Sequence, residues 1–248
     1  MNTPLFVANW KMGVPLEQTL KQMKEFVEHT TTEERSHAVL CPSFPAIAGV
    51  RSAYSGAMVG AQDCSSEPDG AFTGEVSAHD LRALGCSHVI IGHSERRAHC
   101  KETDEEIGLK VARAIGVGLR PILCIGEHRL ERKANKTVVV LRRQLEKGLK
   151  HVRSLNRVKL LIAYEPVWAI GATKPAPHEV IEEVHAEIVR WMRRWSGARS
   201  VLFGVLYGGS VDAQTVKGIS NLSNVDGVLV GRASWNGMSC ARLLHAML

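Results

Sequence analysis

The sequence predicts an α/β protein, a single-domain (β/α)8 barrel that comprises residues 1–248. Short apolar segments recur along the chain, and each is followed by a longer stretch with helical periodicity. The apolar segments are nearly continuous rather than alternating, which is typical of strands buried on both faces of a parallel sheet. The length suits one barrel of ~250 residues, and no linker, low-complexity segment or change in composition divides the chain.

Eight such units can form a closed barrel or an open, doubly wound sheet. The open sheet usually carries a Gly-x-Gly-x-x-Gly turn after an early strand, whereas Asn9-Trp10-Lys11 follows the first strand here. The even spacing of the units also favours the barrel. In chain order, the expected strands are residues 5–9, 37–41, 58–62, 88–92, 119–124, 158–164, 201–206 and 225–230.

Four long helices are expected between the strands, because apolar residues recur there at intervals of three and four. The loop at residues 64–77 is longer than the ~2–6 residues usual after a barrel strand, so we expect it either to have a function or to be mobile. Histidines within helical stretches, such as His29, His151 and His185, are expected at the surface. The four helices are predicted at residues 15–28, 104–117, 136–152 and 177–195.

Composition argues against several classes of function. The formal net charge is +6, but the densest basic stretches, residues 129–136 and 190–199, have interspersed apolar residues and are expected to form solvated helix faces. Aromatic residues are only 5% of the chain, which disfavours a nucleic-acid surface. No segment has the length and apolarity of a membrane span or the pattern of a secretory leader. The six cysteines are irregularly spaced and suit free thiols, so a cytoplasmic protein is expected.

Polar residues with catalytic potential follow several of the expected strands, at the end of a barrel where active sites lie. Glu165 is placed to act as a carboxylate base, His93 as a hydrogen-bond donor and Lys11 as a cation. This set suits proton transfer between two carbons beside a carbonyl. A helix that starts at Ser94 would keep the His93 imidazole uncharged. The scheme needs no metal.

Backbone N–H groups in the turns after the last two strands suit a phosphate dianion. These turns are Tyr207-Gly208-Gly209-Ser210 and Gly231-Arg232-Ala233-Ser234. A zinc site near His88 and His93 is disfavoured, since five residues of strand separate them by roughly 16 Å. Cys124 is expected to have a packing role.

Four motifs, in this order along the chain, resemble those of the triosephosphate isomerases. They are Asn9-Trp10-Lys11, Ile91-Gly92-His93-Ser94-Glu95-Arg96-Arg97, the segment of residues 163–171 that begins Ala163-Tyr164-Glu165-Pro166, and Tyr207-Gly208-Gly209-Ser210. The resemblance implies interconversion of dihydroxyacetone phosphate and D-glyceraldehyde 3-phosphate through an enediolate, in glycolysis and gluconeogenesis. It implies a cofactor-independent enzyme and a sugar-phosphate substrate.

The resemblance also assigns roles to individual residues. Glu165 is the base, His93 the electrophile, and Lys11 and Asn9 the polar contacts to substrate, with Glu95 supporting Lys11. Residues 166–176 are similar to a mobile lid, anchored by Trp168 and latched by Tyr207. A homodimer is implied through the 64–77 loop, with Gln62, Phe72 and Thr73 near the interface. The residues aligned with backbone ligands of the phosphate are Gly171, Ser210, Gly231 and Arg232.

Two departures from the family pattern bear on the substrate. Arg232 stands where the family usually has glycine. It stores strain if the position needs a positive φ; otherwise the replacement is harmless because its backbone N–H still serves, or it clamps the anion more strongly, or it alters the substrate. The lid tip, residues 171–175, reads Gly-Ala-Thr-Lys-Pro, and Thr173 and Pro175 are expected to affect opening and closing rates. The rival functions are isomerisation of a larger phosphorylated ketose, a Schiff-base aldolase acting through Lys11, and a non-catalytic binding protein.

Overall fold

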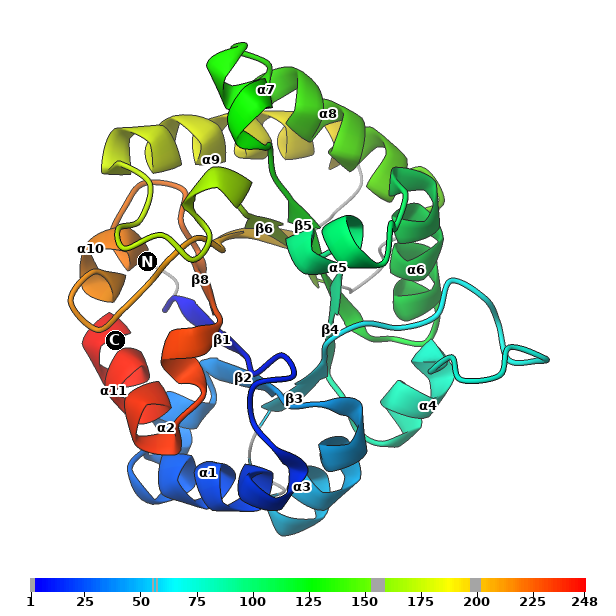
Figure 1. Ribbon diagram of the computed structural model, residues 1–248, viewed down its shortest axis with the longest axis vertical. Coiled ribbons are helices and arrows are strands. Elements are labelled where there is room, and N and C mark those ends of the chain that lie inside the picture. The colour runs from blue at the N-terminus through cyan, green and yellow to red at the C-terminus, as the bar shows by residue number, and fades with distance from the viewer. Residues whose placement is uncertain (1–2, 55, 57, 153–158, 197–201) are drawn as a thin grey trace.

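A computed structural model describes residues 3–54, 56, 58–152, 159–196 and 202–248. Its parallel strands form a closed barrel in which each pairs with the next in the chain and the last pairs with the first (Figure 1), so the predicted fold class is confirmed. Val158 and Val201, where two expected strands begin, lie outside the described residues, as do residues 197–199 of one basic stretch. The strands are β1 Leu5–Asn9, β2 Ala38–Cys41, β3 Met58–Ala61, β4 His88–Ile91, β5 Arg120–Ile125, β6 Lys159–Tyr164, β7 Leu202–Tyr207 and β8 Gly227–Val230.

Helices surround the barrel, and the four long ones lie within a few residues of their predicted bounds. In the described part of the chain, no helix combines the length and the apolar character needed to cross a membrane. The helices are α1 Leu16–Glu28, α2 Thr32–Arg35, α3 Ile47–Ala53, α4 Ala78–Ala83, α5 Ser94–His99, α6 Asp104–Gly116, α7 Arg129–Lys133, α8 Thr137–Gly148, α9 His178–Ser196, α10 Val216–Ser220 and α11 Gly237–Met247, with short 3-10 turns η1 Phe44–Ala46, η2 Val167–Ala169 and η3 Arg232–Ser234.

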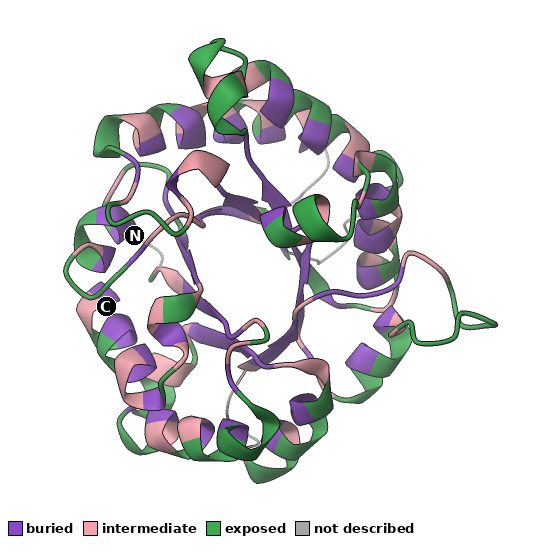
Figure 2. Ribbon diagram, viewed as in Figure 1, coloured by how far each residue is buried: buried purple, intermediate pink, exposed green. Residues whose placement is uncertain are grey.

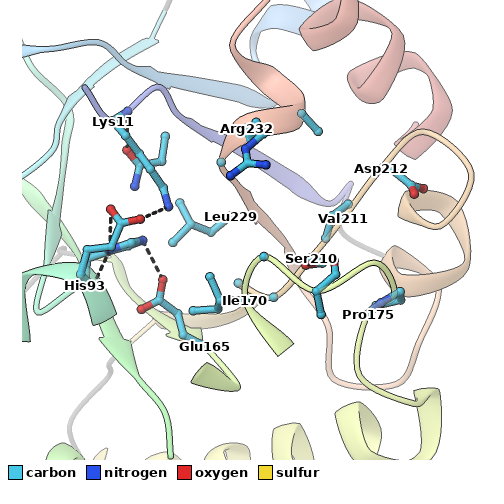
Figure 3. A pocket seen from close by; sticks show the side chains of 18 of the residues that line it. Lys11, His93, Glu165, Ile170, Pro175, Ser210, Val211, Asp212, Leu229 and Arg232 are labelled. Atoms are coloured by element: carbon cyan, nitrogen blue, oxygen red, sulfur yellow. Dashed lines mark hydrogen bonds and ion pairs between the residues drawn. The ribbon is translucent and has the colours of Figure 1, made fainter. Parts of the chain in front are cut away.

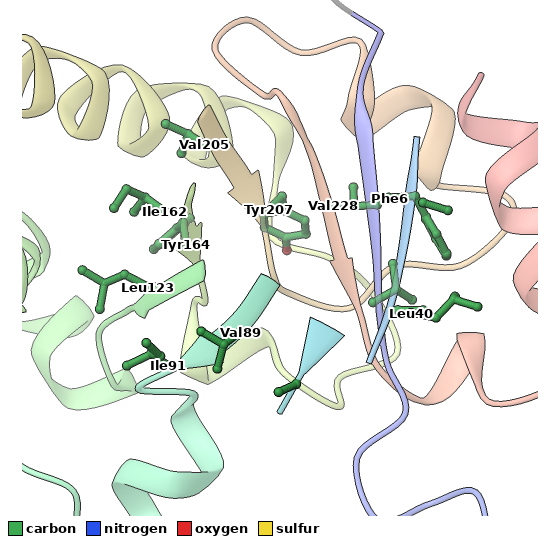
Figure 4. Close-up of a cluster of buried hydrophobic side chains, with 14 of the residues drawn as sticks. Phe6, Leu40, Val89, Ile91, Leu123, Ile162, Tyr164, Val205, Tyr207 and Val228 are labelled. Carbon is green, nitrogen blue, oxygen red and sulfur yellow. The ribbon is translucent and has the colours of Figure 1, made fainter. Parts of the chain in front are cut away.

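Alternate side chains of the strands enter two separate apolar cores, which explains why the strands read as continuously apolar. On β1, Phe6 and Ala8 belong to the layer between barrel and helices, while Val7 belongs to a second cluster with residues such as Ile90 and Cys124. Figure 4 shows the outer layer, and Figure 2 shows buried residues along the strands and the inner sides of the helices. Cys124 is fully buried in the second cluster, consistent with its expected packing role.

The expectation that His185 lies at the surface was wrong, because this residue is fully buried on α9. Its spacing from Ile181 and Ile188 places it on the stripe of the helix that faces the barrel. Its Nδ1 lies 3.0 Å from the carbonyl oxygen of Asn224, and its ring packs edge-on against that of Tyr164. Burial lowers the pKa of His185 to about 4, so the ring is uncharged at neutral pH.

Candidate active site

A cavity of about 470 Å³ opens at the C-terminal ends of the strands, and it gathers most of the residues singled out from the sequence (Figure 3). These residues come from turns that are far apart in the chain but meet at one rim of the barrel. Tyr207 and Trp168 do not line the cavity and instead form hydrogen bonds that hold the segment of residues 166–176. The predicted residues that line it are Asn9, Lys11, His93, Glu95, Glu165, Gly171, Ser210, Gly231 and Arg232.

The carboxylate of Glu165, which follows β6, is buried and holds two partners. Oε1 lies 3.0 Å from Nε2 of His93, and Oε2 accepts the backbone N–H of Ser94 at 2.8 Å. Burial raises the pKa of Glu165, but the neighbouring His93, the Ser94 N–H and the Lys11 ammonium outweigh burial and leave that pKa below its ordinary value. The carboxylate is therefore ionised at neutral pH, as a general base must be.

The imidazole of His93 is fixed in one orientation by contacts on both nitrogens. His93 precedes α5, and its Nδ1 accepts the backbone N–H of Glu95 at 3.2 Å. A nitrogen that accepts a hydrogen bond carries no proton, so the proton of the ring lies on Nε2 and points toward Glu165. The helix start thus occupies Nδ1 as an acceptor and leaves the Nε2 N–H directed toward the Glu165 carboxylate at the cavity.

Lys11 reaches the cavity from a backbone conformation that is unusual for a lysine, with φ at +51°. Its backbone N–H donates to Oδ1 of Asn9 at 3.0 Å, and its carbonyl accepts from Nε2 of Gln62 at 2.8 Å. The ammonium lies 2.5 Å from Oε1 of Glu95. Sequence reasoning missed this role of Gln62; its position at the end of β3, on the same rim, was the available indication.

Several residues that line the cavity have unused backbone donors. The N–H groups of Gly171, Ser210, Gly231 and Arg232 have no acceptor within the described part of the protein. Arg232 is absent from the residues with positive φ, so the replacement of the usual glycine stores no strain of that kind. Free backbone N–H groups on residues that line a concave site are suited to an anion.

The segment of residues 166–176 lines part of the cavity and is held at several points. The hydroxyl of Tyr207 accepts the N–H of Ala176 at 2.9 Å, and the hydroxyl of Ser210 lies 2.9 Å from the carbonyl oxygen of Ala169. The indole N–H of Trp168 donates to Oε1 of Glu127 at 2.9 Å. Sequence reasoning missed Glu127, because nothing in its local sequence indicates a partner 41 positions away.

Gly126 follows β5 and lies against the backbone of Glu165, where a Cβ would stand 1.7 Å from the carbonyl oxygen of that residue. We predict that Gly126→Ala lowers the free energy of unfolding by about 3 kcal/mol or more, since the obstacle is backbone. Gly116, at the end of α6, is a matched control because a Cβ there meets nothing within 4 Å. Urea unfolding of both variants checks the prediction, and equal midpoints would contradict it.

Comparisons with known proteins place this geometry in a family. Residues 4–247 match the family model described as triosephosphate isomerase. The triosephosphate isomerase of Geobacter metallireducens is 42% identical over 251 residues, and that of Trichlorobacter lovleyi is 40% identical over 248 residues, with 99% of each chain covered in both cases. The crystal structure of triosephosphate isomerase from Bartonella henselae superposes with a TM-score of 0.86 at 32% identity and covers 98% of both chains.

Proposed function

Because the chain belongs to the triosephosphate isomerase family, we propose how its cavity carries out the reaction of that family. The protein is an intramolecular aldose–ketose isomerase of glycolysis that interconverts dihydroxyacetone phosphate and D-glyceraldehyde 3-phosphate. The observation that supports our assignment of roles is the meeting of Glu165, His93 and Lys11 around one cavity. These side chains come from the ends of β6, β4 and β1.

Glu165 is the base that removes a proton from one carbon of the substrate and returns it to the next. To do so its carboxylate exchanges the contacts with His93 and Ser94 for the substrate carbon. The N–H on Nε2 of His93 is then free to donate to the carbonyl oxygen as negative charge develops there. Lys11 stabilises the resulting enediolate, with Asn9 and Glu95 fixing its position.

The substrate phosphate occupies the wall formed by the free N–H groups of Gly171, Ser210, Gly231 and Arg232. Binding there fixes the three-carbon unit between base and imidazole, so that remote binding energy serves the proton transfer. Residues 166–176 act as the lid, with Trp168 and Tyr207 holding its two ends. Closure excludes water, which strengthens the electrostatic interactions and protects the enediolate.

A coupled dehydrogenase assay with purified protein tests the function. Comparing kcat/KM for glyceraldehyde 3-phosphate with that for a tetrulose phosphate separates this function from isomerisation of a larger ketose. Absence of an adduct on Lys11 after borohydride treatment with substrate would exclude the Schiff-base aldolase. Absence of turnover with every phosphorylated ketose would favour a binding protein and contradict the assignment.

The remaining features of the proposal concern assembly and location. Residues 1–248 act as one catalytic domain in the cytoplasm, and two copies associate through the 64–77 loop. That loop projects from the barrel (Figure 1), and Phe72 within it is 41% exposed. Exposed apolar side chains on a protruding loop are suited to burial against a partner.

We predict that sedimentation equilibrium gives twice the 27.2 kDa mass of one chain. Thr73→Arg is expected to shift the protein toward monomer, because a charge near the loop tip would be buried on association. Val139→Arg is the control, since Val139 on α8 is 66% exposed and distant in sequence from the loop. A wild-type protein that sediments as a monomer, or equal dimerisation of both variants, contradicts the proposed interface.

A further inference from the structure

Arg232 differs from the other charged residues around the cavity in having no partner. It is exposed to solvent at the start of η3, directly after β8 and Gly231. Its side chain forms no hydrogen bond or ion pair with any residue that the structure describes. In Figure 3 the guanidinium lies at the cavity between Lys11 and Ser210.

The carboxylates around the cavity are already engaged. Among the described lining residues, Glu95 pairs with Lys11, and Glu165 holds His93 and the Ser94 N–H. Asp212 accepts hydrogen bonds from the backbone N–H groups of Gln214 and Thr215, at 2.9 Å each. None of the carboxylates in the described part of the chain therefore pairs with Arg232, although a guanidinium at a concave site is stabilised by an anion.

The backbone and the side chain of Arg232 belong to the same wall. The backbone N–H of Arg232 is one of the unused donors assigned above to the substrate phosphate. The preceding residue, Gly231, lies close to the Lys11 side chain: a Cβ on Gly231 would stand 3.1 Å from Lys11 Cε. A guanidinium offers several N–H donors in a planar fork, which matches the oxygens of a phosphate. A glycine at this position would supply the backbone donor alone.

We propose that the Arg232 guanidinium is a side-chain ligand of the substrate phosphate, added to the backbone N–H groups. This inference rests on the proposed function for the location of the phosphate. The side chain then determines specificity for phosphorylated over unphosphorylated substrates. It also makes the site a stronger receptor for free inorganic phosphate.

The test compares Arg232→Gln, which removes the charge, with Arg232→Lys, which keeps the charge but not the fork. Arg232→Gln is expected to weaken binding of inorganic phosphate, measured by calorimetry, roughly 10- to 100-fold, and kcat/KM for glyceraldehyde 3-phosphate is expected to fall similarly. Arg232→Lys should recover part of both losses. Turnover of unphosphorylated glyceraldehyde should stay unchanged in both variants, which a merely structural role would not allow.

Arg194→Gln on the exposed face of α9 is the control for the loss of one positive charge. Unchanged phosphate affinity in Arg232→Gln, or equal losses with glyceraldehyde and its phosphate, would overturn the inference. Calorimetry needs no turnover, so the role of Arg232 is decided even if the wild-type protein proves inactive as an isomerase. Failure of the proposed function and failure of this inference are thus separate results.

Discussion

Glu165→Gln is expected to lower kcat by roughly 10²- to 10⁴-fold, because an amide cannot accept the carbon-bound proton. The substitution keeps the length of the side chain, and its amide oxygen can still accept the Ser94 N–H that now bonds to Oε2. Folding and phosphate binding are therefore expected to persist. The coupled assay in both directions of the reaction gives the measurement.

Glu179→Gln, an exposed position in the first turn of α9, is the matched control and should retain full activity. A Glu165→Gln protein with kcat near the wild-type value would falsify the assignment of the base. Calorimetric titration with inorganic phosphate distinguishes a chemical defect from a damaged site. If the variant neither turns over substrate nor binds phosphate, the substitution has disrupted the structure of the cavity and has not only removed the base.

His93→Ala is the second large effect, with an expected loss in kcat of roughly 10²- to 10³-fold. The variant lacks the N–H that would meet the developing charge on the carbonyl oxygen. It also lacks one of the contacts that lower the pKa of Glu165, so that pKa rises. The acid limb of the kcat/KM profile, where the base becomes protonated, should consequently move to higher pH.

His151→Ala serves as a control because His151 is exposed beyond the end of α8. A reduced kcat with an unmoved acid limb would leave the donor role intact but contradict the contact between His93 and Glu165 in solution. Unchanged kcat would remove His93 from the mechanism. The value of kcat therefore tests His93 as the electrophile, and the position of the acid limb independently tests its effect on the pKa of Glu165.

Much of the site could be predicted because a barrel brings the ends of its strands together. Continuous apolar segments located the strands, and each candidate side chain followed one of them, so residues as distant as Lys11 and Glu165 could be assigned to one rim. The cavity contains both residues, together with His93. What was needed was only the order of strands and the polar residue after each.

The supporting contacts could not be predicted in this way. Gln62 holds the Lys11 carbonyl from 51 positions away, and Glu127 holds the Trp168 indole from 41 positions away. Such partners depend on the direction of side chains within the folded barrel, and no periodic pattern in the sequence indicates them. His185 shows the same limit, because its polar ring suggested solvent whereas the helical stripe on which it lies faces the core.

The pairing of β1 with both β2 and β8 has a consequence for how the chain matures on the ribosome. Phe6 and Ala8 align with Val228 and Val230, so β1 keeps one unpaired edge until β8 has been synthesised. Nascent chains expose that edge to other strands. Closure of the barrel, and with it the final positioning of Lys11 beside Gly231, therefore waits for the synthesis of β8.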